Sequence, residues 1–301
     1  MALTELKRLG DTCGLDFSAI KDISPAESLL KIYTLVVPGS EALNIWQKLR
    51  SGAEQTDYWP VIAGSPAEFK ARDLQVLLEK LHDIPEFIQR GQQLSIDEWL
   101  NKAISQIDFR EQVVDCETGI AMHRALEEYA SDISGAGLAK FEEAAKGLGV
   151  NPGGWLGGEY TCLHCPEIPV KSNTQDDLIG YRNILTNQPY DQVVMLLVPT
   201  KTPWEVAAYL NIGYGNQLHE PHEHFAIHKF WYEKYGAEII TSTNDTVEMI
   251  VSRPPQSPEE AQTLAQQQFV YAPDIVKCGT GKTSALASQL NNGVSWYFWW
   301  D

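Results

Sequence analysis

The C-terminal segment Ser295–Asp301 constrains the fold more than any other part of this chain. It reads Ser-Trp-Tyr-Phe-Trp-Trp-Asp, and a frayed chain end cannot bury so many aromatic rings. We therefore expect the segment to be docked as a strand in a β-sheet. Side chains alternate along a strand, so both of its faces would be apolar. The two sets are Val294, Trp296, Phe298 and Trp300 on one face, and Tyr297 and Trp299 on the other.

Other strands and helices are also marked in the sequence. The runs 32–37 and 193–198 are short and β-rich, and the second is apolar without alternation, which is typical of a strand covered on both faces. The runs 237–242 and 246–252 flank Asn244-Asp245 and predict a hairpin. Serine caps with a glutamate three residues later predict four helix starts, at Ser24, Ser65, Ser95 and Ser257.

These elements predict an α+β fold, in which an antiparallel or mixed sheet is flanked by helices. We expect an N-terminal region over residues 1–190 and a C-terminal α+β domain over 191–301. The first region would comprise a short α/β segment (1–83), a mostly helical segment (84–146) and an irregular connection (147–190). The long connection is rich in glycine, proline and polar residues, and such loops are usually functional or mobile.

The net charge excludes one class of partner. With 23 Lys and Arg against 40 Asp and Glu, the formal charge is −17, which repels phosphate backbones, so no nucleic-acid partner is expected. Five scattered cysteines do not form a disulfide framework. The N-terminus has no signal-peptide pattern, and no apolar run has the ~20 residues that a membrane span needs. We expect a soluble cytoplasmic protein that does not bind a membrane.

Two motifs partly resemble known kinds of site, a phosphate-binding loop and a cysteine pair. Gly279–Thr283 resembles the end of a phosphate-binding loop, but Val276 stands where the first glycine is needed. We interpret it as a turn into a helix over 284–291. Cys162 and Cys165 lack the second pair that a structural zinc needs, and Pro166 disfavours the helix of a redox pair. We interpret them as thiols in a loop, and we expect no cofactor.

A histidine cluster is the remaining candidate for chemistry. His219, His222, His224 and His228 lie within ten residues. If Pro221 opens a helix, His224 and His228 lie one turn apart on one face, which is the spacing of a two-histidine metal clamp. The alternative is that apolar neighbours bury this helix and the histidines bind nothing. We take the second interpretation, so no metal is expected.

A binding surface is the broader hypothesis for this part of the chain. The loop before Pro221 is rich in glycine and polar residues, and binding groups concentrate on such loops. We expect a ligand site at this loop and at the end of the aromatic strand. Its candidate residues are Asn216, His219, His222, His224, Tyr297, Trp299 and Asp301. The alternative is that the loop merely connects two helices.

Several separated motifs resemble one bacterial family. In order they are Leu197–Thr200, Trp204–Asn211, Tyr235–Ile240, Arg253–Pro255, Asp274–Val276 and Trp296–Asp301. Together they are similar to the family called domain of unknown function 4253, over about residues 192–301. Thr56–Val61 is similar to an upstream element of longer members. The resemblance implies no catalytic residue. The family commonly has Cys-Pro where this chain has Leu218-His219, and it lacks the surrounding histidines.

Three functions remain open at this stage. The first is a non-enzymatic binding or interaction protein, for example one that neutralises a basic bacterial effector. The second is an enzyme of unassigned reaction, with a cleft between the aromatic strand and residues 213–228. The third is a small-molecule sensor using the same aromatic residues. The expected partner is accordingly a basic protein or a small molecule, and the sequence does not indicate an oligomeric state.

Overall fold

The computed structural model describes residues 20–71, 78–107, 135–150, 173–183, 185–210 and 219–300. It also describes the positions 4, 10, 109, 112–114, 118, 121–122, 124–125, 160–162 and 212. The chain divides into two compact units. The first comprises Met1–Ile96, Asn173–Pro254 and Gly293–Asp301, and the second comprises Asp97–Ser172 and Pro255–Asn292. Within the described ranges, none of the helices combines the length and apolar character that a membrane crossing requires.

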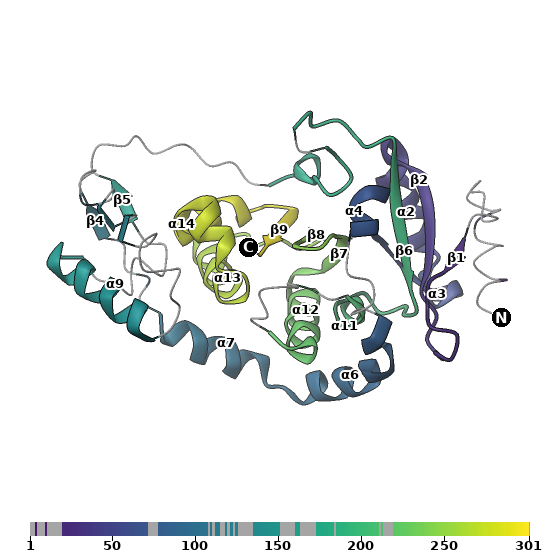
Figure 1. Cartoon of the computed structure of the whole chain (residues 1–301), viewed down its shortest axis with the longest axis horizontal. Helices are drawn as coiled ribbons and strands as arrows, with labels where there is room; N and C mark the ends of the chain where they lie inside the picture. Colours follow the sequence, from purple (N-terminus) through teal and green to yellow (C-terminus); the bar gives the residue numbers. More distant parts are fainter. Residues whose placement is uncertain are drawn as a thin grey trace. The chain divides into compact units, whose positions relative to one another are not determined.

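The first unit is organised around a seven-stranded sheet (Figure 1). Its order is β1-β2-β6-β3-β7-β8-β9. Neighbours run antiparallel except β3 and β7, which are parallel, so the predicted α+β class with a mixed sheet is confirmed. The strands are β1 Lys21–Asp22, β2 Tyr33–Pro38, β3 Trp59–Ile62, β6 Gln192–Val198, β7 Ala237–Ser242, β8 Thr246–Val251 and β9 Ser295–Trp299.

The predicted strands lie where the sequence indicated, including β2 at the run 32–37. The apolar strand β6 lies between β2 and β3 and is buried from its second residue onward. The hairpin forms as β7 and β8, with a register shift between Ile239 and Thr241. The aromatic segment forms β9 at the edge of the sheet, paired with β8 alone. In β9 the alternation holds, because Trp296 and Phe298 are buried whereas Tyr297 is 37% exposed.

Helices cover both faces of this sheet. The helical elements of the first unit are η2 Gly39–Glu41, α2 Ala42–Ser51, α3 Ala53–Thr56, α4 Pro66–Ala71, η3 Lys80–Asp83, α6 Ile84–Gln93, η4 Gln175–Asp177, η5 Pro203–Glu205, α11 Val206–Tyr209 and α12 Pro221–Tyr235. We call the two sides of the sheet the α2 face and the α12 face, after the helix that packs on each.

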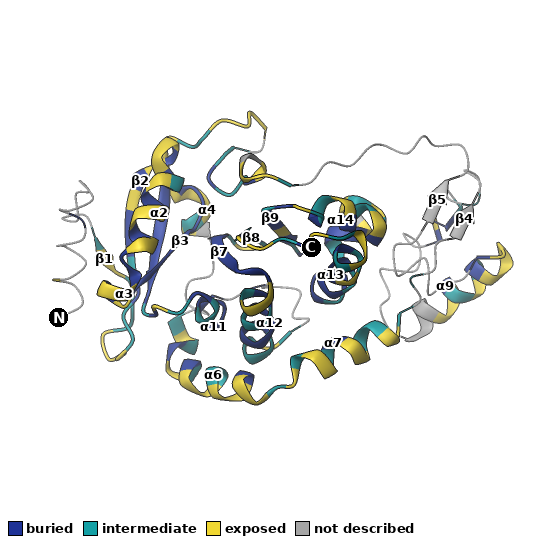
Figure 2. Cartoon of the chain, turned by 180° about the vertical axis from the view of Figure 1, so that it is seen from behind, coloured by how far each residue is buried: buried dark blue, intermediate teal, exposed yellow. Residues whose placement is uncertain are grey.

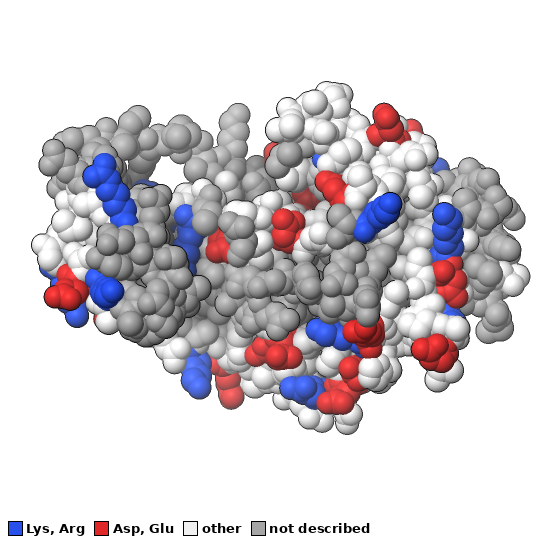
Figure 3. Space-filling view, in the orientation of Figure 1, with Lys and Arg blue, Asp and Glu red and all other residues white. Residues whose placement is uncertain are grey.

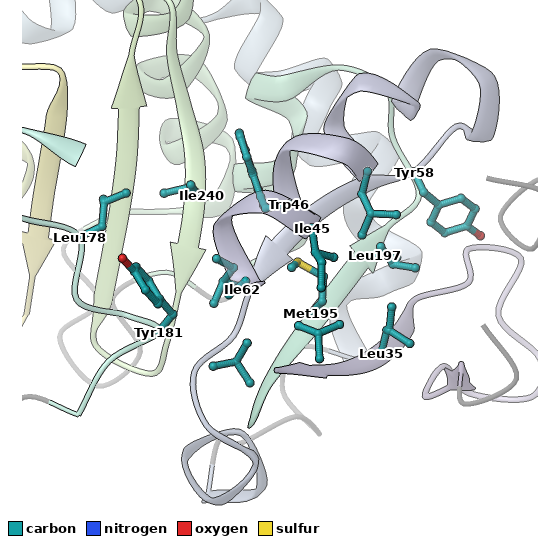
Figure 4. Close-up of a cluster of buried hydrophobic side chains, with 14 residues drawn as sticks. Leu35, Ile45, Trp46, Tyr58, Ile62, Leu178, Tyr181, Met195, Leu197 and Ile240 are labelled. Carbon is teal, nitrogen blue, oxygen red and sulfur yellow. The ribbon is translucent and has the colours of Figure 1, made fainter. Parts of the chain in front are cut away.

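The α2 face carries a large apolar core. Helix α2 contributes Trp46, whose indole N–H donates to the Pro60 carbonyl oxygen at 2.8 Å and so fixes the helix to β3. The described residues 173–183 and 185–190 form a segment that we call the strap. Its Leu178 and Tyr181 belong to the same core as Met195 of β6 (Figure 4). The strap therefore covers the part of this face that α2 leaves.

The α12 face is closed by stacked aromatic rings. Trp231 of α12 stacks on Phe298 of β9 with ring centroids 5.3 Å apart and an interplanar angle of 11°. Trp231 also meets Trp296 edge-on at 5.6 Å, and Tyr235 meets the same indole at 5.5 Å. The aromatic strand is thus docked against one helix. Figure 2 shows the buried residues of α12 and β7 in dark blue.

The second unit is largely helical in its described part. Its elements are α7 Ile96–Ser105, β4 Gln112–Val114, α9 Gly135–Gly147, β5 Tyr160–Cys162, α13 Pro258–Tyr271, the π-helix η6 Ile275–Thr280 and α14 Thr283–Leu290. Strands β4 and β5 pair in parallel, so residues 147–190, expected to be irregular, contain a strand. A small apolar core includes Met122, Phe141 and Ala145.

The serine caps and the glycine-rich turn were mostly interpreted correctly. Ser65 and Ser257 each accept the N–H of the residue three positions later, at 3.2 and 3.1 Å. The turn interpretation of Gly279–Thr283 is confirmed, because η6 ends there and α14 begins at Thr283. The helix predicted at Ser24 was wrong. The Ser24 hydroxyl accepts the Ile32 N–H at 2.6 Å instead, because the chain returns at once to β2.

The division of the chain differs from the one expected at residue 190. Residue 190 lies in the first unit, and β6 begins only two residues later, at Gln192. Strand β6 pairs with β2 and β3, which come from the N-terminal part of the chain. Both units are built from segments that are separate in sequence, which hydrophobic periodicity does not reveal.

Candidate functional site

The histidine segment forms the start of α12. Pro221 opens this helix, as predicted. Glu220 and Glu223 form a reciprocal capping box, in which the Glu220 N–H donates to Glu223 Oε2 at 2.8 Å. The carboxylates between the histidines are therefore engaged in starting the helix.

Two of the histidines point into the protein. His224 and His228 lie one turn apart and are 4% and 1% exposed. Burial lowers the pKa of His228 to about 3, and its ring meets Trp231 edge-on at 5.8 Å. Burial also lowers the pKa of His224 well below its usual range, and the neighbouring His219 lowers it further. Both imidazoles are therefore neutral at pH 7 and act as parts of the core.

The other two histidines lie at the start of α12, and the side chain of His219 is itself only 6% exposed. The His219 ring meets the His224 ring edge-on at 5.7 Å, and its Nδ1 lies 4.0 Å from Glu223 Oε2. His222 Nε2 lies 3.4 Å from Arg90 Nη2 of α6. Burial lowers the pKa of His222, and the positive charge of Arg90 lowers it further. Packing between α6 and α12 accounts for this contact, because the Gly91 position allows the two helices to approach closely.

The predicted metal alternative finds no support in the geometry. Among the residues that the structure describes, no group of three or more His, Cys, Asp or Glu side chains is arranged to hold a metal ion. His224 and His228 are buried, and each packs against another ring, that of His219 for His224 and that of Trp231 for His228. The side chain of Cys162 and the whole of Cys165 lie outside the described residues.

The predicted ligand residues do not gather in one place. His224 lies on α12, whereas Tyr297 and Trp299 belong to the opposite, α2 side of β9, since Trp296 and Phe298 face α12. The described residues of the expected cleft are therefore separated by the sheet itself. Asn216 and Asp301 lie outside the described residues.

A buried carboxylate that the sequence analysis did not single out lies on β7. Glu238 is 6% exposed and receives two hydrogen bonds from Arg50 of α2, at 2.7 Å from Nε and 2.6 Å from Nη2. This two-pronged geometry is the strongest that an arginine and a carboxylate form. The hydrogen bond to Glu238 is the main cause of the raised pKa of Arg50. The pair joins α2 to the sheet.

A second buried carboxylate holds the strap on the sheet. Glu248 of β8 is 1% exposed and accepts the N–H groups of Ile179 and Gly180, at 2.6 and 2.8 Å. Burial raises the pKa of Glu248, and these two hydrogen bonds oppose that rise. Gly180 is required here, because a Cβ atom would lie 2.0 Å from Thr241 Cγ2. The strap thus approaches the sheet through its backbone.

A positional signal in the sequence could have identified both carboxylates. Glu238 and Glu248 each stand between apolar residues in the predicted hairpin, which carries a further apolar strand beside it. A strand with apolar neighbours on both sides is covered on both faces, and an acid in it needs a dedicated partner. Arg50 and Gly180 are far away in sequence, so the partners could not be named.

The family motifs around Pro199 have structural roles. Thr200 donates its hydroxyl to Glu205 Oε2 at 2.6 Å, which closes the turn after β6. The Tyr209 hydroxyl donates to the Pro199 carbonyl oxygen at 3.0 Å. Burial raises the pKa of Tyr209 to about 12, with a further contribution from Glu205, so the phenol stays protonated and remains a donor. These contacts set the path from β6 into α11.

One side of strand β9 faces no other strand among the described residues, and we call it the open side. Trp300 donates its N–H to the Asp245 carbonyl oxygen at 3.0 Å, and the Val294 carbonyl oxygen accepts from Val251 at 2.9 Å. Backbone groups alternate along an antiparallel strand, so the N–H and C=O groups of Tyr297 and Trp299 point away from β8. No described strand lies on that side of β9, because it is the last in the sheet.

Comparisons with known proteins bear on the C-terminal part. No curated protein and no solved structure matched the chain. A family model described as a domain of unknown function (DUF4253) matches residues 194–301, which include β7, β8 and β9. The resemblance identified in the sequence is therefore confirmed, and residues 194–301 of this chain carry the match to the DUF4253 family.

Proposed function

We propose that this chain is a non-enzymatic protein-binding module and that the open side of β9 is its binding surface. The observation that carries the proposal is an edge strand whose outward backbone groups have no described partner, flanked by the exposed aromatic residue Tyr297 and the partly exposed Trp299. Exposed edge strands readily pair with another chain, and proteins generally protect them. An aromatic edge strand without such protection therefore indicates a binding surface.

The buried ionisable groups support a binding role over catalysis. Glu238 is engaged by Arg50, and Glu248 by two backbone N–H groups. His224 and His228 are enclosed in the core of the α12 face. The two carboxylates hold α2 and the strap in place and the two imidazoles fill the core, and both are structural uses. An acid or base that reacts with a substrate needs hydrogen-bonding reach to it.

We also propose that the protein works in the bacterial cytoplasm. The scattered cysteines and the acidic composition support a reducing compartment. Its target would be another protein of the same cell, such as a basic effector that it neutralises.

A site-specific crosslinking experiment tests the binding role. Tyr297→p-benzoylphenylalanine places a photoreactive side chain on the open edge, and the same replacement of Val36, which is 42% exposed on β2, is the matched control. We expect one discrete protein adduct in cells from position 297 and none from position 36. If adducts formed only from probes placed within residues 85–190, the binding surface would lie in that region and not at β9.

A further inference from the structure

We infer that the open side of β9 accepts an extended, basic segment of another protein as an added β-strand. This inference rests on the proposed binding function and names the chemistry of the partner. It uses three features of the edge: the direction of its backbone groups, the charges at its two ends, and its aromatic side chains.

The backbone sets how a segment would bind. Tyr297 and Trp299 each direct an N–H and a C=O outward, and they lie two residues apart, at about 7 Å along the strand. An added strand repeats with the same period, so it can exchange hydrogen bonds with both residues. Asn173 limits the site at one end, because its side-chain Nδ2 donates to the Ser295 carbonyl oxygen at 3.3 Å. The site therefore suits a short segment.

Two exposed carboxylates lie near the two ends of β9. At one end Asp177 accepts the hydroxyl of Thr174, whose carbonyl oxygen in turn accepts from Ser295 Oγ at 2.6 Å. At the other end Asp245 belongs to the turn between β7 and β8, on the β8 side of β9, and its carbonyl oxygen accepts the Trp300 N–H. Asp245 Oδ1 accepts the hydroxyls of Thr243 and Thr246, at 3.3 and 3.1 Å. Asp177 also accepts the Thr174 N–H in a capping box. Hydroxyl groups and a backbone N–H carry no net positive charge, so these contacts do not neutralise either carboxylate.

The described basic residues do not neutralise these two carboxylates. No described Lys, Arg or His forms an ion pair with Asp177 or Asp245. Elsewhere acidic and basic side chains are interspersed, as Figure 3 shows for the described residues of one face. The local pair of acids is therefore a more specific signal than the net charge of −17.

The aromatic side chains complete the match to a basic strand. Tyr297 is 37% exposed and Trp299 is partly exposed on the same face. Lysine and arginine side chains are attracted to the faces of such rings, at about 0.5–1 kcal/mol at exposed sites. A strand with basic residues at alternate positions would place them over these rings and toward the two carboxylates.

A second copy of this chain is a less suitable occupant. Pairing β9 with β9 would bring two chains of net charge −17 together and place the carboxylates near the ends of each β9 close to one another. Like charges brought together across an interface cost several kcal/mol. The charge therefore favours a basic partner over self-association.

The test uses the full chain and defined peptides. The probe is an eight-residue (Lys-Val)4 peptide, and its controls are (Glu-Val)4 and a (Lys-Val)4 peptide N-methylated on alternate residues. We expect (Lys-Val)4 to bind and to slow hydrogen exchange at the Tyr297 and Trp299 amides. We expect the N-methylated peptide, which keeps the charge but loses strand donors, to bind at least about tenfold more weakly. The protein itself is unchanged in these comparisons, so a folding defect cannot explain the result.

Protein variants then separate the two contributions. Asp177→Asn with Asp245→Asn should weaken (Lys-Val)4 binding about tenfold, since each exposed pair contributes up to about 1 kcal/mol. Equal binding of (Glu-Val)4 would overturn the basic partner while leaving the edge as a binding surface. Equal binding of the N-methylated peptide would overturn strand addition. If no peptide changed the hydrogen exchange of the Tyr297 and Trp299 amides, this inference would be overturned. The proposed binding function would still be decided separately, by the crosslinking experiment. Self-association through β9 without peptide would also overturn the basic occupant.

Discussion

The two faces of the central sheet bury ionisable side chains in opposite ways. On the α12 face, His224 and His228 are kept neutral by burial, which lowers the pKa of each. On the α2 face, Glu238 and Glu248 are instead given partners, a guanidinium in one case and two backbone N–H groups in the other. An imidazole can lose its charge near neutral pH and a carboxylate cannot do so cheaply, which explains the difference.

This difference predicts which changes destabilise each face of the sheet. The α12 face depends on aromatic packing and on pH, because its imidazoles must stay neutral. The α2 face depends on particular partners, because removing one leaves a buried acid or donor unsatisfied. The following predictions separate the two modes, beginning with the largest effect.

Packing on the α12 face should give the largest loss. Phe298→Ala removes a ring stacked on Trp231 and should lower the free energy of unfolding by about 4 kcal/mol. Tyr297→Ala, one residue away on the outer side of β9, is the matched control and should cost about 1 kcal/mol. Urea unfolding followed by fluorescence measures both. Equal losses would mean that β9 is not docked by its inner side chains.

Removal of a partner on the α2 face comes next. Arg50→Leu leaves Glu238 buried without its counter-charge and should cost about 3 kcal/mol, at the low end for a buried pair because Arg50 is 43% exposed. The double variant Arg50→Leu, Glu238→Leu removes both charges and should recover most of that loss. The comparison is made by thermal unfolding. A double variant no more stable than the single one would show that the ion pair itself stabilises the fold.

The pH response should come mainly from the α12 face. An imidazole whose pKa is lower in the fold than in the unfolded chain takes up protons on unfolding, so stability is complete above about pH 6.5 and falls below it. With a folded pKa of about 3, His228 alone should cost about 2 kcal/mol between pH 7 and pH 5. Glu248 acts in the opposite direction. Because its pKa is raised in the fold, it takes up a proton there more readily than in the unfolded chain, so acid stabilises the fold at this residue and offsets part of the loss caused by His228.

The His228→Phe variant isolates that contribution. Its free energy of unfolding, measured at pH 7 and at pH 5, should fall less than that of the unaltered chain. Ser288→Ala, on the exposed side of α14, is a control that should leave the pH dependence unchanged. The same pH dependence in His228→Phe would mean that His228 is already charged in the fold.

The smallest effect is expected where the strap meets β8. Glu248→Gln keeps the shape of the side chain but turns one acceptor into a donor, which leaves the Ile179 or Gly180 N–H unsatisfied at a cost of about 1–2 kcal/mol. Faster hydrogen exchange of those two amides is the specific readout. Glu259→Gln, an exposed acid of α13, should change neither quantity.

The sequence contained most of the individual elements but little of their arrangement. Strand β6, the hairpin and β9 could be predicted because local patterns of apolar residues indicate which residues are buried. The pairing of β3 with both β6 and β7 could not, since it joins residues far apart in the chain. The helix at Ser24 failed because a distant N–H, that of Ile32, uses the same hydroxyl.

The candidate site was predictable to a smaller extent. Dense histidines drew attention to α12, yet density does not indicate whether a side chain points inward, and His224 and His228 do. Glu238 and Glu248 were not singled out among 40 acids, because composition does not distinguish a paired buried acid from a solvated one. Their position between apolar residues of the hairpin was the signal that the sequence offered. Tyr297 and Trp299 were found through alternation, which does carry the direction of each side chain.

The position of β3 has a consequence for how this protein can be divided. Strand β3, Trp59–Ile62, lies between β6 and β7, and both of those strands belong wholly or mostly to the matched range 194–301. That range on its own therefore lacks the strand that joins its two halves, so we do not expect it to fold alone. A gene fusion that transplants residues 191–301 alone would carry a gap in its sheet. Residues 20–71 supplied as a separate polypeptide would fill the gap, which makes the two fragments a natural pair for split-protein complementation.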